Sequence, residues 1–436
     1  MATYSYMRFA QFVCVAGLGS IFVLAGCEKN LFQNSNAAAP AMRDVPAVRL
    51  NYRYEADVPT PSAETARATG EERNAAIQAD FDGNRSLELL DRTLSSPDKK
   101  RIVAIYHRIS DIQSEYRIDM YAPDGKLLKK LTSDTMAVHF PDTIVWSPDS
   151  SALAFVAMIR AGQDETGANP ITPPVLQTNP AANSNPPDSD VTPTPPPAPT
   201  PAAPTGILTF HTEQIYICSS EGAGIKPVTN NETLIYFYYI WSPDSTMLAA
   251  LATTAREWKY LDVVAASKGE QMIPLGRPRI IEKNGRERRL DDNLTSVRPV
   301  WSPDSAKVAD AFDTQVRIYD ASGTNPTQAA IPLRNQLLIS SQAYDRDQQR
   351  KLQAANANAD PAANTPATPD QPISTLPDEK LLVSYNPVVT LDWTGDDLLY
   401  LETAYVRRMV KETDSARSFS RWHRLVLTPQ FVAPTR

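Results

Sequence analysis

Few residues of this sequence have the types and spacings that carry out catalysis. Its four histidines, at positions 107, 139, 211 and 423, lie in distant segments, and none has an acidic residue or a second histidine at metal-ligand spacing. After residue 26 the chain contains no GxSxG nucleophile elbow, no HExxH pair and no phosphate-cradling GxxxxGK[ST] loop. We therefore predict no catalytic residue, no metal site, no cofactor and no enzymatic activity.

One cysteine does predict covalent chemistry. An apolar stretch from Phe9 to Val23 ends in the sequence Leu-Ala-Gly before Cys27, which resembles the bacterial lipobox, where the cysteine thiol accepts lipid. We expect a lipoprotein signal peptide over residues 1–26, and a lipidated Cys27 with a flexible tether over 27–46. Acyl chains such as palmitate would then hold the protein on membrane lipid. The alternatives are an uncleaved anchor or an ordinary secretory signal.

Charge and cysteine content exclude several classes of partner and site. Loss of residues 1–26 removes Arg8 and no acidic residue, so 42 of the 43 basic residues stay beside 50 acidic ones, a net charge of −8. This balance argues against a nucleic-acid partner. Cys14 leaves with the signal peptide and Cys27 carries lipid, so Cys218 is the only free thiol. An intramolecular disulfide and a cysteine-based metal site are therefore excluded.

The chain contains an internal repeat. The sequence WSPDS occurs at Trp146–Ser150, Trp241–Ser245 and Trp301–Ser305, with a degenerate copy at Trp393 and an upstream Ser-Pro-Asp at 96–98. Two of the intervals are long because low-complexity inserts occupy about 161–207 and 345–377. We expect these inserts to be disordered, with a short helix over 344–358. Removing them leaves roughly 50 to 60 residues per repeat, the size of a four-stranded propeller blade.

The repeated residues have a structural interpretation. Proline suits the second position of a type I turn, the aspartate accepts hydrogen bonds from nearby backbone amides, and the tryptophan packs between sheets. The serine that closes each turn is expected to keep a negative φ. The structural set comprises Trp146, Pro148, Asp149, Trp241, Pro243, Asp244, Trp301, Pro303, Asp304 and Trp393.

The repeat resembles that of TolB-like, WSPDG-type β-propellers. The resemblance implies an all-β fold, a β-propeller of four-stranded blades over residues 47–436. Five repeats are visible and six blades are expected, one of them assembled from both ends of the chain with Ala47–Glu55 as a strand. Closing the ring in this way would protect strand edges.

A tight basic cluster is the candidate contact with a partner. Arg286, Arg288 and Arg289 lie in a segment that we expect between blades, on the rim that also carries the inserts. The alternative is a solvated loop balanced by neighbouring acidic residues.

These features predict a membrane-anchored, extracytoplasmic interaction or scaffold module of the cell envelope. Its partners would be membrane lipid, through acylated Cys27, and envelope proteins, with the propeller monomeric and facing the periplasm or the cell exterior. One alternative is a binder of a sugar or peptide at a channel mouth lined by Tyr236–Tyr239. Another is a hydrolase or lyase in the central channel, where only Asp142, Arg298 and Asp392 offer charge.

Overall fold

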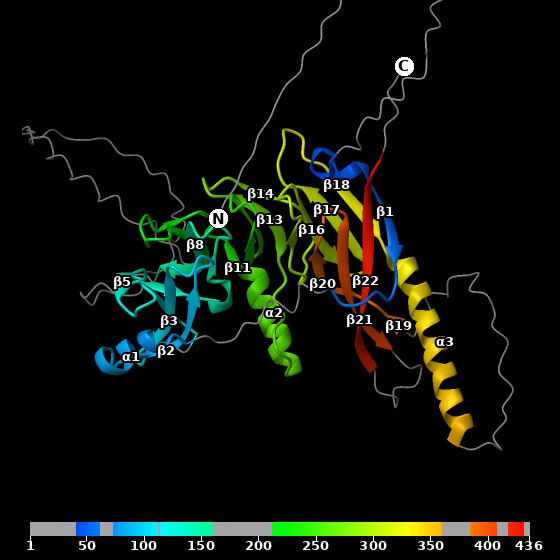
Figure 1. Ribbon diagram of the computed structural model, residues 1–436, viewed down its shortest axis with the longest axis horizontal. Helices are drawn as coiled ribbons and strands as arrows, with labels where there is room; N and C mark the ends of the chain where they lie inside the picture. Colours follow the sequence, from blue (N-terminus) through cyan, green and yellow to red (C-terminus); the bar gives the residue numbers. More distant parts are fainter. Residues whose placement is uncertain are drawn as a thin grey trace, which may run out of the picture. The chain divides into compact units, whose positions relative to one another are not determined.

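A computed structural model of the chain describes residues 41–61, 73–111, 114–159, 212–359, 384–407 and 417–430. Within these ranges the fold consists mostly of antiparallel β-sheets, with few helices (Figure 1). The prediction of four-stranded antiparallel sheets is confirmed. The predicted lipidation site Cys27, the signal peptide and the first insert lie outside the described residues.

Five sheets follow one another along the chain, and we number them in that order. Sheet 1 contains β2 (Glu88–Ser95), β3 (Ile102–Arg108), β4 (Arg117–Tyr121) and β5 (Leu127–Lys130). Sheet 2 contains β6 (Met136–Val138), β7 (Val145–Trp146), β8 (Ala152–Ile159), β9 (Gln214–Ser219) and β10 (Lys226–Pro227). Sheet 3 contains β11 (Leu234–Trp241), β12 (Met247–Thr254), β13 (Arg277–Glu282) and β14 (Glu287–Arg289).

Sheets 4 and 5 complete the array. Sheet 4 contains β15 (Val300–Trp301), β16 (Lys307–Phe312), β17 (Gln315–Asp320) and β18 (Gln328–Pro332). Sheet 5 contains β19 (Ser384–Tyr385), β20 (Val388–Trp393), β21 (Leu398–Arg407), β22 (Arg417–Pro429) and β1 (Leu50–Glu55). The helices are α1 (Ala75–Asn84), α2 (Ala255–Lys268), α3 (Arg334–Ala359) and the short 3₁₀ turns η1 (Met42–Asp44), η2 (Ala47–Arg49) and η4 (Pro141–Thr143).

The strands after the SPDS turns are apolar on both faces because each sheet packs between two neighbours. Strands β8 and β12 are buried along nearly their whole length. Separate hydrophobic clusters join sheet 1 to sheet 2, sheet 2 to sheet 3, sheet 3 to sheet 4, and sheet 4 to sheet 5. A further cluster packs α1 against sheet 1 through Ile77 and Phe81. The core is therefore a series of layers between sheets.

The SPDS turns correct one expectation from the sequence. Ser150, Ser245 and Ser305 have φ values of 61°, 62° and 62°, so the serines occupy the left-handed region and not the expected negative φ. Only glycine adopts this conformation without steric cost. Asp149 holds the first of these turns as expected of a turn acceptor, since its Oδ1 accepts from the Ser147 hydroxyl at 2.6 Å and the Ser151 amide at 3.0 Å.

These serines also make a hydrogen bond to the neighbouring sheet, which explains why serine is tolerated in this left-handed conformation. The backbone amide of the turn aspartate in one sheet donates to the serine hydroxyl of the next sheet's turn. The three contacts are Asp98 to Ser150 at 3.0 Å, Asp149 to Ser245 at 3.1 Å and Asp244 to Ser305 at 3.0 Å. We call this series the turn ladder. It places the SPDS turns of sheets 2 to 4 and the Ser96–Lys99 turn of sheet 1 side by side, and we call this end of the sheets the turn end.

Both ends of the chain build sheet 5. Strand β1 pairs antiparallel with β22 from Leu50↔Pro429 to Glu55↔Arg424, so the expected N-terminal strand is present. It forms the outer strand of sheet 5 and does not begin a separate sheet. Among the described residues the sheets number five, and a sixth blade stays a prediction.

The opposite end of the sheets carries the long connections. Strand β12 leads into α2 and β18 leads to α3 there, and we call it the helix end (Figure 1). The expected short helix over 344–358 is part of α3, which starts earlier, at Arg334. None of the helices described is both long and apolar enough to cross a membrane.

Candidate functional site

The repeated tryptophans lie between sheets. Trp146, Trp241 and Trp301 are buried, and each indole Nε1 donates to a backbone carbonyl of the preceding sheet. The acceptors are Leu94 at 3.2 Å, Val145 at 3.4 Å and Ile240 at 3.2 Å, respectively. Trp393 is also buried, but its Nε1 has no hydrogen-bond partner within the described ranges. These indoles therefore connect sheets and do not form a ligand-binding surface.

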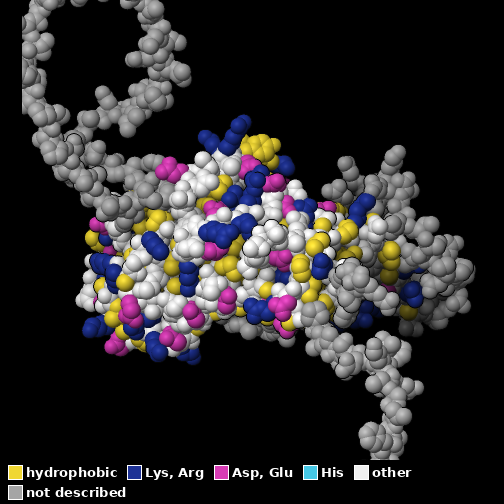
Figure 2. Space-filling view, turned by 90° about the horizontal axis from the view of Figure 1, so that it is seen from above, with side chains coloured by type: hydrophobic (Ala, Val, Ile, Leu, Met, Phe, Trp, Pro, Cys, Tyr) yellow, Lys and Arg dark blue, Asp and Glu magenta, His cyan; other side chains and the backbone are white. Residues whose placement is uncertain are grey.

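The basic cluster lies elsewhere than the sequence suggested. Residues 277–289 form the β13–β14 hairpin of sheet 3, so Arg286 stands at the turn end and not on the rim with the inserts. Arg286 pairs with Glu282 at 3.6 Å and Arg289 with Asp292 at 2.7 Å, both at the surface. Viewed from above, the molecule shows basic and acidic side chains interspersed (Figure 2).

Arg288 has a different environment from its two neighbours. Its guanidinium is half-buried and donates to the carbonyl oxygens of Asp320 and Ala321 in sheet 4. Burial lowers the pKa of this guanidinium, and the nearby Asp320 opposes the effect. Arg288 therefore joins sheets 3 and 4, and only Arg286 and Arg289 face solvent.

The aromatic residues expected at a channel mouth are partly in the core. Tyr236 and Tyr239 are fully buried between sheets 2 and 3, where their hydroxyls donate to Glu287 and to the Thr143 carbonyl. Phe237 packs on Trp258 of α2, and Tyr238 lies under the Arg298 guanidinium, 4.8 Å away.

A repeated arginine on the third strand of four sheets was missed by the sequence analysis. Each of these arginines lies towards the helix end and pairs with a carboxylate from a connecting segment. The pairs are Arg117–Asp111 at 2.8 Å, Arg277–Glu257 at 2.8 Å, Arg317–Asp291 at 2.5 Å and Arg421–Asp57 at 2.7 Å. In sheet 2 Gln214 has this position. The sequence does carry a signal for these arginines, because each stands among alternating apolar residues of a strand. Their acidic partners, however, are distant in the sequence or lie in loops.

A pocket of about 680 Å³ lies at the helix end of sheet 1. Its lining is formed by the segment after α1, the end of β3 and the end of β5, and comprises Asn84, Arg85, Ser86, Leu87, Glu88, Arg108, Ile109, Ser110 and Lys130. We call it the sheet 1 pocket. The register of β2 and β3 explains the ion pair in this lining, because Glu88 on β2 stands directly opposite Arg108 on β3.

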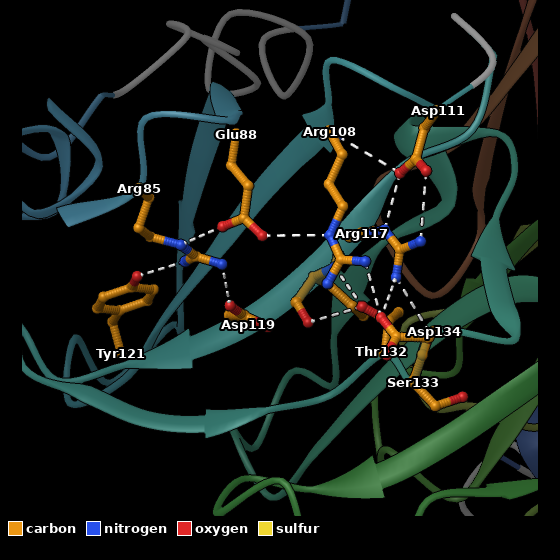
Figure 3. A network of polar contacts seen from close by, with 11 residues as sticks. Arg85, Glu88, Arg108, Asp111, Arg117, Asp119, Tyr121, Thr132, Ser133 and Asp134 are labelled. Atoms are coloured by element: carbon orange, nitrogen blue, oxygen red, sulfur yellow. Dashed lines mark hydrogen bonds and ion pairs between the residues drawn. The ribbon is translucent and has the colours of Figure 1, made fainter.

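Arg85 organises the inner wall of this pocket (Figure 3). Its guanidinium donates to Asp119 at 2.7 Å, to the Tyr121 hydroxyl at 2.7 Å and to Glu88. It also lies 4.2 Å from the ring centre of Phe81 in α1. Burial raises the pKa of Asp119, although Arg85 opposes the shift. All three guanidinium nitrogens of Arg85 therefore donate hydrogen bonds, and this side chain positions the inner wall of the pocket.

Arg108 forms the outer wall and is more accessible. Its Nε donates to Glu88 at 3.3 Å and its Nη1 to Asp134 at 2.8 Å. Arg117 stands beside it and holds Asp111 and the Ser133 carbonyl (Figure 3). The pocket thus has rigid cationic walls, an arrangement suited to holding an anion. In the described part of the chain no group of three or more His, Cys, Asp or Glu side chains is placed to hold a metal ion.

A second pocket, of about 470 Å³, is lined by Arg289, Leu290, Asp291, Asp292, Asn293, Arg317 and Gln328, and we call it the sheet 4 pocket. Asp310 of β16 is not part of this lining but stands opposite Arg317 in the register. Asp310 is completely buried, and its Oδ2 has no hydrogen-bond partner among the described residues. Burial raises the pKa of Asp310 well above its usual range. Asp291 lines the pocket; burial would raise its pKa, but hydrogen bonds from Tyr319 and Arg317 outweigh that effect and lower it.

Comparisons with known proteins concern the fold. No protein-family model and no curated protein sequence matches this chain. An oligogalacturonate lyase in complex with manganese is similar over 86% of this chain and 73% of its own, with 10% identity and a TM-score of 0.33. Prolyl oligopeptidase B from Galerina marginata is similar over 86% of this chain and 46% of its own, with 9% identity and a TM-score of 0.36. Both kinds of enzyme contain a β-propeller domain.

Two peptidases are also similar in structure. A prolyl endopeptidase is similar over 84% of this chain, with 9% identity and a TM-score of 0.33. A puromycin-hydrolysing peptidase of Mycobacterium tuberculosis is similar over 87% of this chain, with 10% identity and a TM-score of 0.29. This chain spans 41% of the length of each. The prediction that the protein is not an enzyme is contradicted, because the similar structures include peptidases and a lyase. Such distant likeness transfers no site or substrate, and it shows no TolB-like family.

Proposed function

We propose that the five sheets are consecutive blades of a β-propeller, and that the protein is a lipid-anchored envelope module that binds partners at its helix end. The single observation that carries this proposal is where the N-terminal segment is attached. Lys307 Nζ donates to the Val45 carbonyl at 2.6 Å, and the Ala47 amide donates to Asp320 at 2.9 Å. Both contacts lie at the turn end of sheet 4, where Lys307 pairs with Asp320.

This attachment supports one orientation of the domain relative to a membrane. A chain anchored through Cys27 reaches the domain at the turn end, because residues 42–49 are fixed there. The helix end is then directed away from the lipid. The sheet 1 pocket is located at that end, and so is α2.

Helix α2 supports a binding role for the helix end. Its start is fixed by a capping box between Thr254 and Glu257 and by two hydrogen bonds from Arg277 to Glu257, at 2.9 and 2.8 Å. None of its residues is buried, and Tyr260 and Val263 are exposed. A helix of this length is marginal alone in water. Its packed face, which includes the contact of Trp258 with Phe237, is only half-buried, so a firmly held helix that exposes Tyr260 and Val263 suits contact with another molecule.

Photo-crosslinking in cells tests the proposal. An amber-encoded photo-crosslinker at Val263 should give protein adducts that mass spectrometry identifies, while the same group at Ser151, exposed at the turn end, should give none. Cys27→Ser should move the protein from the membrane to the soluble fraction. Adducts from Ser151 alone would refute the orientation, and a Cys27→Ser protein that stays with the membrane would refute the lipid anchor.

A second candidate function is hydrolysis or elimination at the sheet 4 pocket. The observation that favours it is the pair Asp310 and Asp291, whose environments shift their carboxyl pKa values in opposite directions. Two carboxyl groups whose environments move their pKa values apart are an arrangement that acid–base catalysis uses. Here Asp291 lines the pocket and Asp310 lies behind Arg317, its cross-strand neighbour.

Turnover assays test this candidate. The purified full chain would be given nitrophenyl esters, nitrophenyl glycosides, peptidyl nitroanilides and a uronide oligomer. Asp310→Asn, which keeps the shape of the side chain, should lower any turnover by about 10²- to 10⁴-fold. Asp124→Asn, at an exposed carboxylate that belongs to neither pocket, should leave it unchanged. Turnover that survives Asp310→Asn would remove the pair from consideration.

A further inference from the structure

The sheet 1 pocket has more positive than negative charge on its walls. Arg85, Arg108 and Lys130 line it, against the single carboxylate of Glu88. Arg85 and Arg108 both donate to that carboxylate. Among the lining residues positive charges therefore outnumber negative ones, while Asp119 and Asp134, outside the lining, also pair with Arg85 and Arg108.

Two of these cations remain accessible to a ligand. Arg108 uses Nε and Nη1 for Glu88 and Asp134, and its side chain is 34% exposed. Its Nη2 makes no hydrogen bond to any residue that the structure describes, and a guanidinium offers five donors in total. Lys130 is exposed on the outer strand β5 and stands opposite Asp119 in the register. An arginine nitrogen and a lysine ammonium thus face one pocket.

The rim of the pocket is aliphatic. Leu87 and Ile109 are 71% and 62% exposed, and the Ile109 amide donates to the Leu87 carbonyl at 3.0 Å. This hydrogen bond holds the two side chains as neighbours at the end of β2 and β3. Exposed aliphatic surface gains about 25 cal/mol for each Å² that a ligand covers.

From these features we infer that the sheet 1 pocket binds a peptide segment that carries a carboxylate side chain next to an aliphatic one. The carboxylate contacts Arg108 and Lys130, and the aliphatic side chain covers Leu87 and Ile109. The lining contains no aromatic ring. Sugars stack on aromatic rings, so the lining favours a peptide over an acidic sugar. The inference rests on the proposed function, because it names the chemistry of the partner at the helix end.

Peptide binding by the purified full chain in detergent tests the inference. The probe is a fluorescein-labelled, end-blocked peptide with the sequence Gly-Ser-Leu-Glu-Leu-Ser-Gly, measured by fluorescence anisotropy. Replacing its glutamate by glutamine should weaken binding about tenfold or more, because a charge-assisted hydrogen bond is lost. Lys130→Gln and Ile109→Ser should each weaken the binding of the glutamate peptide.

A matched variant controls for general charge effects. Lys226→Gln removes an exposed lysine from β10 of sheet 2, away from the pocket, and should leave binding unchanged. Arg108→Gln should also weaken binding, but it removes the partner of Glu88 and Asp134, so its thermal midpoint is measured alongside. The Lys130 side chain makes no hydrogen bond or ion pair with another described residue, and its charge acts only at a distance on Asp119, opposite it in the register. The result for Lys130→Gln is therefore the decisive one. Equal binding of the two peptides, or no effect of Lys130→Gln and Ile109→Ser, overturns the inference.

Two further outcomes separate this inference from the proposed function. If a uronic-acid oligomer displaces the peptide and binds more tightly, the pocket is a sugar-acid site and the peptide assignment is wrong. If crosslinks from Val263 persist in cells while Lys130→Gln leaves peptide binding intact, the helix end binds partners but the pocket assignment fails. If the peptide binds as expected and no crosslink forms at Val263, the pocket stands and the proposed function fails.

Discussion

The serines of the SPDS turns show how one residue can satisfy two demands. A left-handed φ costs a non-glycine residue roughly 1–2 kcal/mol, and glycine would avoid that cost. The serine hydroxyl, however, accepts the amide of the neighbouring turn's aspartate. These amides are partly buried, and a missing acceptor for a buried amide costs about 1–3 kcal/mol, so the loss here is at most comparable with the strain.

Substitutions at Ser245 separate these two effects. Ser245→Gly should change the free energy of unfolding little, because relief of the backbone strain offsets the lost hydrogen bond. Ser245→Ala keeps the strain and loses the hydrogen bond, so it should destabilise by about 1–3 kcal/mol. Urea unfolding of the two variants measures the difference. Equal stabilities would show that the backbone is not strained at this position.

A buried histidine should make stability depend on pH. His423 is completely buried beside Tyr54 and Thr403, and burial, followed by the nearby Arg421 charge, lowers its pKa from 6.5 to about 4. The folded state therefore resists protonation while the unfolded chain binds a proton below pH 6.5. The resulting stability is present above pH 6.5 and is lost as the pH falls towards 4.

The size of this loss can be measured. Between pH 7 and pH 5 the contribution of His423 amounts to about 2 kcal/mol of unfolding free energy. Wild type should therefore lose about 2 kcal/mol more than His423→Gln over this interval, with both followed by urea unfolding. Parallel curves for the two proteins would mean that His423 titrates normally in the fold.

At the scale of elements, the sequence predicts where strands occur, but it does not predict which elements pack against one another. The apolar strand after each SPDS turn follows from the sequence, because it is buried on both faces and needs no polar alternation. Helix α2 was missed, since no apolar run distinguishes it and its stability depends on Arg277, which is distant in sequence. The sheet 1 pocket was missed for the same reason, because α1 and two strands must meet before Arg85 and Arg108 share a wall.

Two tryptophans allow a matched test of the contacts between sheets. Trp301 donates to Ile240 at 3.2 Å, whereas the Nε1 of Trp393 lacks a partner in the described region. Phenylalanine removes the same volume at each site. Trp301→Phe should therefore destabilise by about 1–3 kcal/mol more than Trp393→Phe, because it leaves a carbonyl unpaired. Thermal unfolding gives the comparison, and a larger effect at Trp393 would show that its indole has a partner in solution.

At the scale of the whole molecule, the first and last strands that the structure describes, β1 and β22, pair in sheet 5. The N-terminal strand was expected from Ala47–Glu55, but the sequence does not indicate which edge it joins, and it completes the fifth sheet along β22. A chain starting at residue 41 should melt like the full protein. A chain starting at residue 56 lacks β1 and leaves the β22 edge and its apolar neighbours exposed, so it should aggregate or melt several degrees lower. Equal melting of the two truncated proteins would mean that β1 adds no stability.

The turn ladder also has a direction, and this bears on how repeats can be added or lost. In the second, third and fourth copies, the hydroxyl at the fourth turn position accepts a hydrogen bond from the copy before it. The first copy, which has no copy before it, has Lys99 there, at φ 58°, and the degenerate last copy, to which the turn ladder does not extend, has Asp397. A duplicated unit inserted between two internal copies would have a backbone amide donor in the copy before it and a serine hydroxyl acceptor in the copy after it. A unit added before the first copy would meet a lysine, so growth of the array by gene duplication is easier in its middle than at its start.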